Sequence, residues 1–186
     1  MELFDAIASR RSIKEFTDRR VSGEEIGRIL DAAVQAPNHR MTEPWRFYVL
    51  GPEARRGYGA ALGARKARRV EDPQAADAVA AKVADTHAAL PAMLAVAMTL
   101  DENPEIREED YAATFMAIQN LSLTAHAMGL GTHLKTGAVM DDPRAREAVG
   151  VPKGERIVAT IHLGEPATVP DPKPRRPAEA LTAWLD

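Results

Sequence analysis

The chain of 186 residues contains no cysteine. Disulfide bonds, thiolate catalysis and zinc sites with thiolate ligands are therefore excluded. Neither sign of charge dominates, because 24 Lys and Arg residues stand against 27 Asp and Glu residues, for a formal net charge of −3. This balance gives no reason to expect nucleic acid or an acidic membrane surface as a partner.

Long apolar runs are missing as well. The longest, Ala88 to Leu100, is too short to span a bilayer and is interrupted by Pro91. The first residues, Met1 to Asp5, lack the basic region and the long apolar stretch of a signal peptide. We therefore expect a soluble, cytoplasmic protein with no membrane partner.

Several motifs of well-known enzyme classes are also absent. Gly57, Gly59 and Gly63 have one residue too many between them for the dinucleotide-binding motif G-x-G-x-x-G, and they lie too far from the preceding strand. The five histidines show no metal-ligand spacing, and the serine hydrolase motif G-x-S-x-G does not occur. The sequence thus predicts neither a metal site nor a side-chain catalyst, and most of the histidines are interpreted as ordinary surface or core residues.

Helical and strand patterns alternate only in part, and the strands are few. Helices are predicted over Met1–Arg10, from Ser22 to before Pro37, twice within Glu53–Ala89 with a hinge near Asp72-Pro73, over Glu108–Leu130, and from Asp142-Pro143 through Val149. Strands are predicted over Arg46–Leu50, Pro91–Leu100 and Arg156–Leu163, with a short extended piece over Thr132–Gly137. This order favours one α+β domain over residues 1–186, built on a small mixed sheet.

Some boundaries have specific chemical signals. Ser22 and Glu25 fit a capping box at a helix start, and Gly129 with Gly131 is typical of a left-handed helix end. Asp101 to Arg107 reads as a polar loop. The helix predicted after it is apolar on nearly all sides, which indicates burial on several sides and hints at a second subunit. The tail from about residue 165 is rich in Pro and charge and should be extended, with a last helical turn or two over Ala178–Leu185.

The most informative stretch is Ser9 to Phe16, where Arg10, Arg11, Ser12 and Lys14 crowd together after a short helix. Cations at the end of a helix are stabilised by its dipole, by about 0.3–1 kcal/mol, and that alone would explain two arginines. The alternative is an anion site, because guanidinium groups, a hydroxyl and an ammonium suit a phosphate monoester attached to an electron-rich ring.

The stretch resembles a known family when it is read together with Ala36-Pro37-Asn38-His39, Glu43-Pro44-Trp45-Arg46-Phe47 and Gly129-Leu130-Gly131-Thr132. At these spacings the chain is similar to the flavin-dependent nitroreductases, and most of all to their small single-domain branch. The resemblance covers about Met1 to Arg176. It implies a three-layer α/β/α sandwich that binds FMN at a homodimer interface.

The resemblance also implies which residues surround the flavin. Arg10 and Ser12, with Arg11 alongside, would hold the phosphate and ribityl chain, and either Arg175 or Arg176 would close the phosphate site. The two tail arginines could equally be a solubilising charge pair. Lys14 would lie at the pyrimidine edge, where a fixed ammonium favours the negative charge that follows reduction. Its alternative is a surface lysine.

Further positions match segments that line the flavin pocket in this family. Gln35 and His39 would reach the flavin of the other subunit, Pro44 and Trp45 would line the shared pocket, and Leu134, Lys135 and Thr136 would lie behind the isoalloxazine. Core packing is the alternative for Trp45. The chain departs from larger family members, which carry a Pro-x-Glu-Gly-like motif in place of residues 134–137, and it has no obvious second lysine for the pyrimidine edge.

The function implied is an FMN-dependent oxidoreductase. It would take electrons from NADH or NADPH and pass them to a small-molecule acceptor such as a nitroaromatic or a quinone, by a ping-pong mechanism. Two alternatives stay open. One is another reaction of the same fold, such as dehalogenation or flavin destruction, and the other is a flavin-binding or storage dimer without useful turnover.

Overall fold

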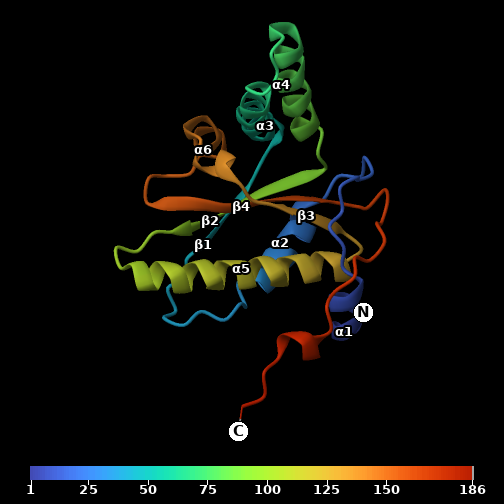
Figure 1. Cartoon of the computed structure of the whole chain (residues 1–186), viewed down its shortest axis with the longest axis vertical. Coiled ribbons are helices and arrows are strands. Elements are labelled where there is room, and N and C mark those ends of the chain that lie inside the picture. Colours follow the sequence, from blue (N-terminus) through green and yellow to red (C-terminus); the bar gives the residue numbers. More distant parts are fainter. Residues whose placement is uncertain (186) are drawn as a thin grey trace.

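The computed structural model describes residues 1–185 and has three layers (Figure 1). Strands β1 (Trp45–Val49), β2 (Ala92–Thr99), β4 (Glu155–Gly164) and β3 (Gly131–Lys135) form one sheet in that spatial order. Helices α3 (Pro52–Ala67), α4 (Pro73–Ala88) and α6 (Pro143–Val149) lie on one face, and α2 (Gly23–Ala33) and α5 (Pro104–Ala127) lie on the other. The expected layered α+β architecture is therefore confirmed. Asp186, the last residue of the expected domain, lies outside the described residues.

Three short helices complete the fold. They are α1 (Leu3–Ser9) and the 3₁₀ turns η1 (Ala138–Asp141) and η2 (Ala178–Leu181). Helix α1 packs against α5, and η2 is the only part of the expected last helical segment that is helical in the described chain. None of the helices within residues 1–185 has the length and apolar character needed to cross a membrane.

All pairings among the four strands are antiparallel. They do not form the mixed sheet that the sequence favoured, and parallel pairing is confined to one isolated bridge between Ser12 and Thr132. Hydrophobic patterns locate strands along the chain but carry no information on their relative direction, which is set by the path of the connections. Antiparallel order here places the ends of β3 and β4 beside the segment that follows α1.

Strand β2 is the buried centre of the molecule. Its residues from Ala92 to Met98 are all buried, as expected for a strand covered on both faces. Met93 and Ala95 pack toward α3 and α6, whereas Leu94 and Val96 pack toward α2 and α5. This alternation follows from the two-residue repeat of a strand and gives the protein two cores, one on each side of the sheet.

Helix boundaries follow their capping chemistry. The expected capping box is confirmed, because the Ser22 hydroxyl accepts from the Glu25 N–H at 3.2 Å and the Glu25 carboxylate accepts from the Ser22 N–H at 2.8 Å. The expected loop over Asp101–Arg107 is wrong in its second half, because α5 begins at Pro104. There the Asn103 side chain accepts from the Glu105 N–H at 2.9 Å, and a proline fits the first helical position.

The two glycines after α5 have different roles. Gly129 has φ +79°, which confirms the left-handed helix end, but Gly131 starts β3 instead of ending the helix. The buried residues of α5 pack against the sheet and α2, and Tyr111 and Met116 are each about 40% exposed. The expected burial on several sides is thus not met within one chain.

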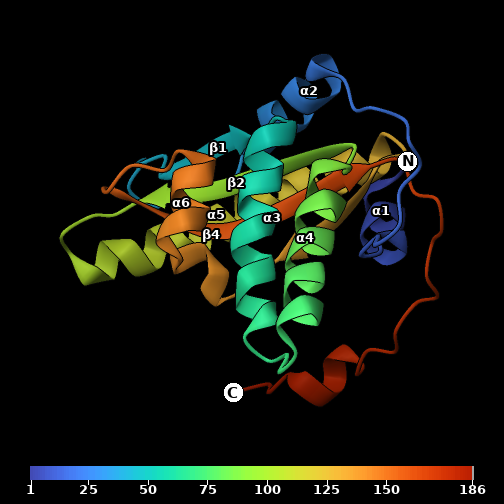
Figure 2. The ribbon, with the colours of Figure 1, turned by 90° about the horizontal axis from the view of Figure 1, so that it is seen from above.

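Helices α3 and α4 form an antiparallel hairpin that stands out from the sheet (Figure 2). The hairpin is close-packed at glycines. A Cβ on Gly63 would lie 2.6 Å from the Ala80 carbonyl oxygen, and one on Gly59 would lie 2.9 Å from the Ala84 Cα. Because these obstacles are backbone atoms, they could move only if the helices separated.

We expect Gly63→Ala to destabilise the fold by about 1–3 kcal/mol, the usual cost of overpacking. Gly27 in α2 is a matched control, because a Cβ there meets nothing within 4 Å. Gly27→Ala should stabilise the helix by up to about 1 kcal/mol. Urea unfolding of the two variants would measure the difference, and an equal effect of both substitutions would contradict the close packing of the hairpin.

Candidate functional site

The cationic segment after α1 is fixed against the edge of the sheet by Ile13. Its N–H donates to the Thr132 carbonyl at 2.9 Å, and its side chain is 3% exposed. A Cβ on Gly131 would collide with Cγ1 of Ile13, so only glycine leaves room for this side chain. Because side chains alternate along an extended segment, the burial of Ile13 turns its neighbours Ser12 and Lys14 outward.

The start of the tail is fixed beside the same segment. The Thr17 N–H donates to the Glu165 carbonyl at 2.9 Å, and the Ala167 N–H donates to the Glu15 carbonyl at 3.0 Å. The Thr168 hydroxyl adds a bond to the Glu15 carboxylate at 3.1 Å. These contacts direct the proline-rich chain that follows over the cationic segment, which explains why an exposed tail keeps a defined path here.

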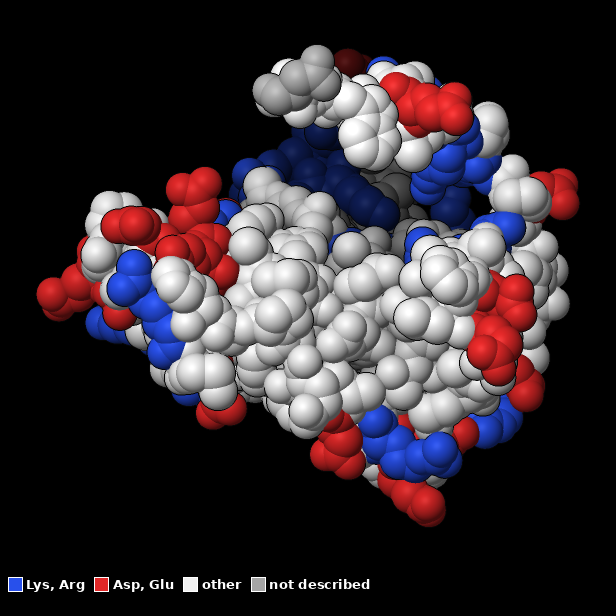
Figure 3. Space-filling view, turned by 90° about the horizontal axis from the view of Figure 1, so that it is seen from below, with Lys and Arg blue, Asp and Glu red and all other residues white. Residues whose placement is uncertain are grey.

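A cavity of about 920 Å³ lies between the cationic segment and the tail. Arg10, Arg11, Ser12 and Lys14 line one wall, and the tail contributes residues from Thr168 to Arg175. In Figure 3 the tail arches over a hollow whose depth is lined with Lys and Arg side chains. Its volume lies within the range of small-molecule sites, roughly 300–1,000 Å³.

The cavity carries a net positive charge. Arg10, Arg11, Lys14, Lys173 and Arg175 line it, against the carboxylates of Glu15 and Asp171. Within residues 1–185, no carboxylate lies within ion-pair distance of any of these five cations. An anion bound here would therefore meet cations that are not already neutralised.

The two interpretations of the arginines, capping of the helix end and binding of an anion, apply to different residues. One Arg11 guanidinium nitrogen donates to the Ala8 carbonyl at 2.8 Å and to the Arg10 carbonyl at 2.9 Å, so Arg11 caps the end of α1. The Arg10 side chain makes no hydrogen bond or ion pair to any described residue. Arg10 is thus the arginine that is available to a ligand.

The remaining expected site residues fall into separate groups. Arg175 lines the cavity, whereas Arg176 does not. Gln35, His39 and Pro44 lie apart from it in the connection between α2 and β1, and Trp45 is the first residue of β1, 7% exposed in the core between the sheet and α5. The cavity between the cationic segment and the tail therefore brings together only some of the expected residues.

The expected stretch of residues 134–136, at the end of β3, does not line this cavity. Leu134 is 40% exposed, Lys135 is half-buried, and Thr136 lines a smaller cavity of about 300 Å³ with Tyr111 and Arg156. Burial lowers the pKa of Lys135, and the nearby ammonium groups of Lys66 and Lys14 lower it further. Lys66 belongs to α3, far from the other two lysines in the sequence, and the fold brings its charge close enough to act on Lys135.

Comparisons with known proteins identify the family. The sequence profile of the Nitroreductase family matches residues 7–165. The chain belongs to this family. It is 35% identical over 175 residues to YfhC of Bacillus subtilis, a candidate NAD(P)H nitroreductase, with 94% of this chain and 90% of YfhC covered.

Solved structures agree with the assignment. A nitroreductase-like family protein from Bacillus cereus superposes with a TM-score of 0.86 at 29% identity, covering 100% of this chain and 97% of the other. A candidate nitroreductase from Desulfovibrio desulfuricans, solved in complex with FMN, gives a TM-score of 0.72 at 25% identity, covering 98% and 96%. The resemblance drawn from the sequence motifs is thus confirmed at the level of family and fold.

This nitroreductase-family chain also contains a histidine cluster, which we define as His87, His133 and His162. His133 and His162 face each other across β3 and β4, and the ring centroids of His162 and His87 are 5.2 Å apart. His87 and His162 are about 5% exposed, and their Nε2 atoms have no partner within residues 1–185. No pattern in the sequence indicated this cluster, because it depends on the register of β3 with β4 and on the position of α4.

Burial favours the uncharged form of all three histidines, because it lowers the pKa of each. The Nδ1–H of His87 donates to the Val83 carbonyl at 2.8 Å, so Nε2 carries no proton in the neutral ring. Burial, with Lys135 as the next cause, lowers the pKa of His162 from its ordinary 6.5 to about 2. The described residues contain no group of three or more His, Asp or Glu side chains arranged to hold a metal ion.

The stability of the folded protein should therefore decrease in acid. The unfolded chain takes up a proton at His162 below about pH 6.5, and the folded chain does not until about pH 2. Stability must then fall as pH drops below 6.5, by up to about 1.4 kcal/mol per pH unit for this one group. We expect His162→Phe to unfold in urea with a weaker pH dependence between pH 6.5 and 5. An unchanged slope would show that His162 is not kept neutral by the fold.

Proposed function

We propose that this protein is an FMN-dependent oxidoreductase that uses NADH or NADPH and reduces a small-molecule acceptor of the nitroaromatic or quinone class. The observation that carries the proposal is the cavity lined by five cations that no described carboxylate neutralises. Family membership supports it, as does the FMN complex of the Desulfovibrio relative.

The donor set of the cavity fits a flavin mononucleotide. A phosphate monoester needs several fixed donors, and Arg10, Ser12 and Arg175 converge on one cavity from two distant parts of the chain. Arg11 would add charge while it caps α1, and Lys173, which the sequence reading overlooked, lies two residues before Arg175 on the same wall. Arg176, which does not line the cavity, is the weaker candidate of the two tail arginines.

Lys14 would serve the ring instead of the phosphate. Lys14, Lys66 and Lys135 lie close enough for their charges to interact, and none of them is paired with a described carboxylate. Fixed positive charge beside a ring that gains negative charge on reduction stabilises the reduced form. Leu134 of β3 and Thr136, which follows the strand, would border the ring. Bound FMN would supply hydride acceptance from the nicotinamide and electron release to the acceptor.

A homodimer is part of the proposal. Helix α1 exposes Leu3, Phe4 and Ile7, with Phe4 84% exposed, and α5 exposes part of Tyr111 and Met116. The face of the molecule that Figure 3 presents is largely uncharged at its centre. Burying such a surface against a second copy would stabilise both chains. Gln35 and His39 would then reach the flavin of the partner subunit and Pro44 would line the shared pocket, whereas Trp45 packs in the core of its own chain.

One open pocket would serve both the nicotinamide and the acceptor, which makes the order of reaction ping-pong. Parallel double-reciprocal plots support this order and intersecting plots contradict it. A relative from Pseudomonas putida is named as a 4-nitrobenzoate reductase, at 26% identity over 218 residues. A nitroaromatic acid is accordingly a reasonable first acceptor, and menadione is a reasonable first quinone.

We expect Arg10→Ala to weaken FMN binding by about 1.5–3 kcal/mol, the usual contribution of a hydrogen bond to a charged group. Riboflavin lacks the phosphate, so the wild type should bind it poorly and the substitution should change its affinity little. Fluorescence titration with both flavins measures the two effects. An equal loss for FMN and riboflavin would mean that Arg10 acts through folding and not through the phosphate.

A further inference from the structure

The loop of residues 38–43, between α2 and β1, has a strained backbone. Met41 has φ +51° and Glu43 has φ +44°, although neither is glycine. Such conformations are uncommon for residues with a Cβ and persist only where the surroundings hold them. Their occurrence twice within three residues indicates that the shape of this loop is imposed by other parts of the chain.

Two adjacent acids of α5 hold the loop. Glu109 accepts from the Nδ1–H of His39 at 3.0 Å and from the Nε–H of Arg40 at 2.9 Å. These two partners, Arg40 first, lower the pKa of Glu109, so its carboxylate is charged. Asp110 is only 3% exposed and accepts from the Thr42 hydroxyl.

The side chain of Asn38, at the start of the loop, bonds to residues at its end. Its side-chain oxygen accepts from the Glu43 N–H at 2.8 Å, and its amide donates to the Thr42 hydroxyl at 3.1 Å. The side chains of His39 and Met41 nevertheless stay more than 70% exposed. Because Nδ1 of His39 is engaged by Glu109, Nε2 is left for another partner.

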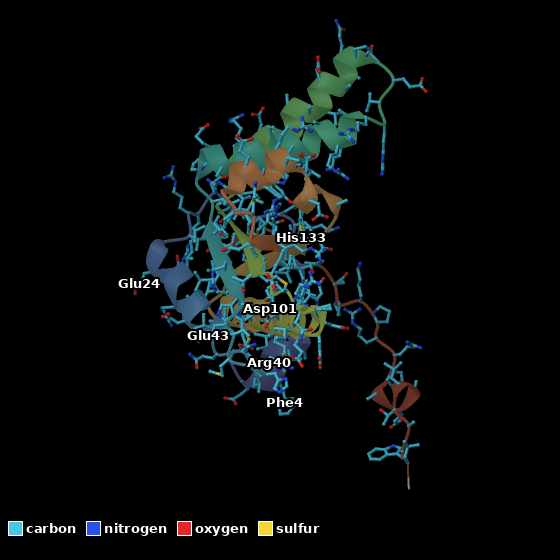
Figure 4. All side chains as sticks on the ribbon, turned by 90° about the vertical axis from the view of Figure 1, so that its left-hand side faces the viewer. Phe4, Glu24, Arg40, Glu43, Asp101 and His133 are labelled. Atoms are coloured by element: carbon cyan, nitrogen blue, oxygen red, sulfur yellow. The ribbon has the colours of Figure 1, made fainter. Side chains whose placement is uncertain are left out.

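The loop lies on the same side of the sheet as the exposed surface of α1. Figure 4 shows Arg40 and Glu43 on that side together with Phe4, whereas His133 lies toward the layer of α3 and α4. A rigid loop that exposes the imidazole of His39 and the thioether of Met41 beside an apolar surface is suited to contact a second molecule.

We propose that Glu109 is a positioning residue, which with Asp110 holds loop 38–43 in the strained form that presents His39 to an aromatic substrate bound at the flavin of the partner subunit. This inference rests on the proposed function, in which the flavin sites lie between two copies of the chain. Neither acid touches the substrate, and both act through the loop.

The first test compares Glu109→Gln with Glu108→Gln in the FMN-loaded protein. Glu108 is the preceding residue of α5, is exposed, and forms no ion pair within residues 1–185. Benzoate is a suitable unreactive probe, followed through the change it causes in the FMN absorption band. We expect its Kd to rise about tenfold in Glu109→Gln, as for loss of one charged hydrogen bond, and to stay unchanged in Glu108→Gln. The KM for menadione should also rise about tenfold, whereas kcat should change by less than about twofold. A general loss of stability would not raise KM while it left kcat nearly unchanged.

The second test asks which chain provides the loop, using hybrid dimers in which only one subunit binds FMN. When Arg10→Ala is on one chain and Glu109→Gln is on the other, the single loaded site faces an intact loop and should bind benzoate like the wild type. When both substitutions are on the same chain and its partner is wild type, the loaded site faces the altered loop and Kd should rise about tenfold. Equal Kd values in the two hybrids, or a wild-type Kd in Glu109→Gln itself, would overturn the inference. A protein that binds no FMN at all would overturn the proposed function as well.

Discussion

The contact of Ile13 with Gly131 fixes the geometry of the candidate site. The Ile13 side chain occupies the space that any Cβ at position 131 would take, and its N–H is bonded to the next residue of β3. Since close-packed interiors tolerate little extra volume, this position specifies both the path of the segment after α1 and the residue type opposite it. Because the side chain of Ile13 points into the interior, those of its neighbours Ser12 and Lys14 point outward and line the cavity.

The tail depends on the same segment. Its backbone bonds to Glu15 and Thr17 bring Thr168 to Arg175 over the cavity, although the chain there has no regular secondary structure of its own. Prolines at 166, 170, 172 and 174 restrict the backbone to extended conformations, which lowers the entropy lost when the tail is held in place. The positive wall of the cavity is thus assembled from the first and last parts of the chain.

Much of this arrangement could be read from the sequence, because its signals are local. The capping box at Ser22, the buried pattern of Ala92–Thr99 and the cations after α1 depend on neighbours within a few residues. Strand direction, the closeness of Lys66 to Lys135 and the facing of His133 and His162 could not be predicted, since each depends on which distant segments pair. The start of α5 was missed although Asn103-Pro104 is itself a helix-start signal, because the charges that follow resemble a loop.

The identity of the flavin tests the account most directly. The cavity provides cations that could bind phosphate, and the sequence contains no dinucleotide-binding motif for an adenine nucleotide. The purified protein should be yellow and should release FMN on denaturation, as measured by chromatography of the supernatant against FMN, FAD and riboflavin standards. Release of FAD, or a colourless protein whose melting temperature does not rise on addition of FMN, would contradict the assignment of this cavity as the flavin site.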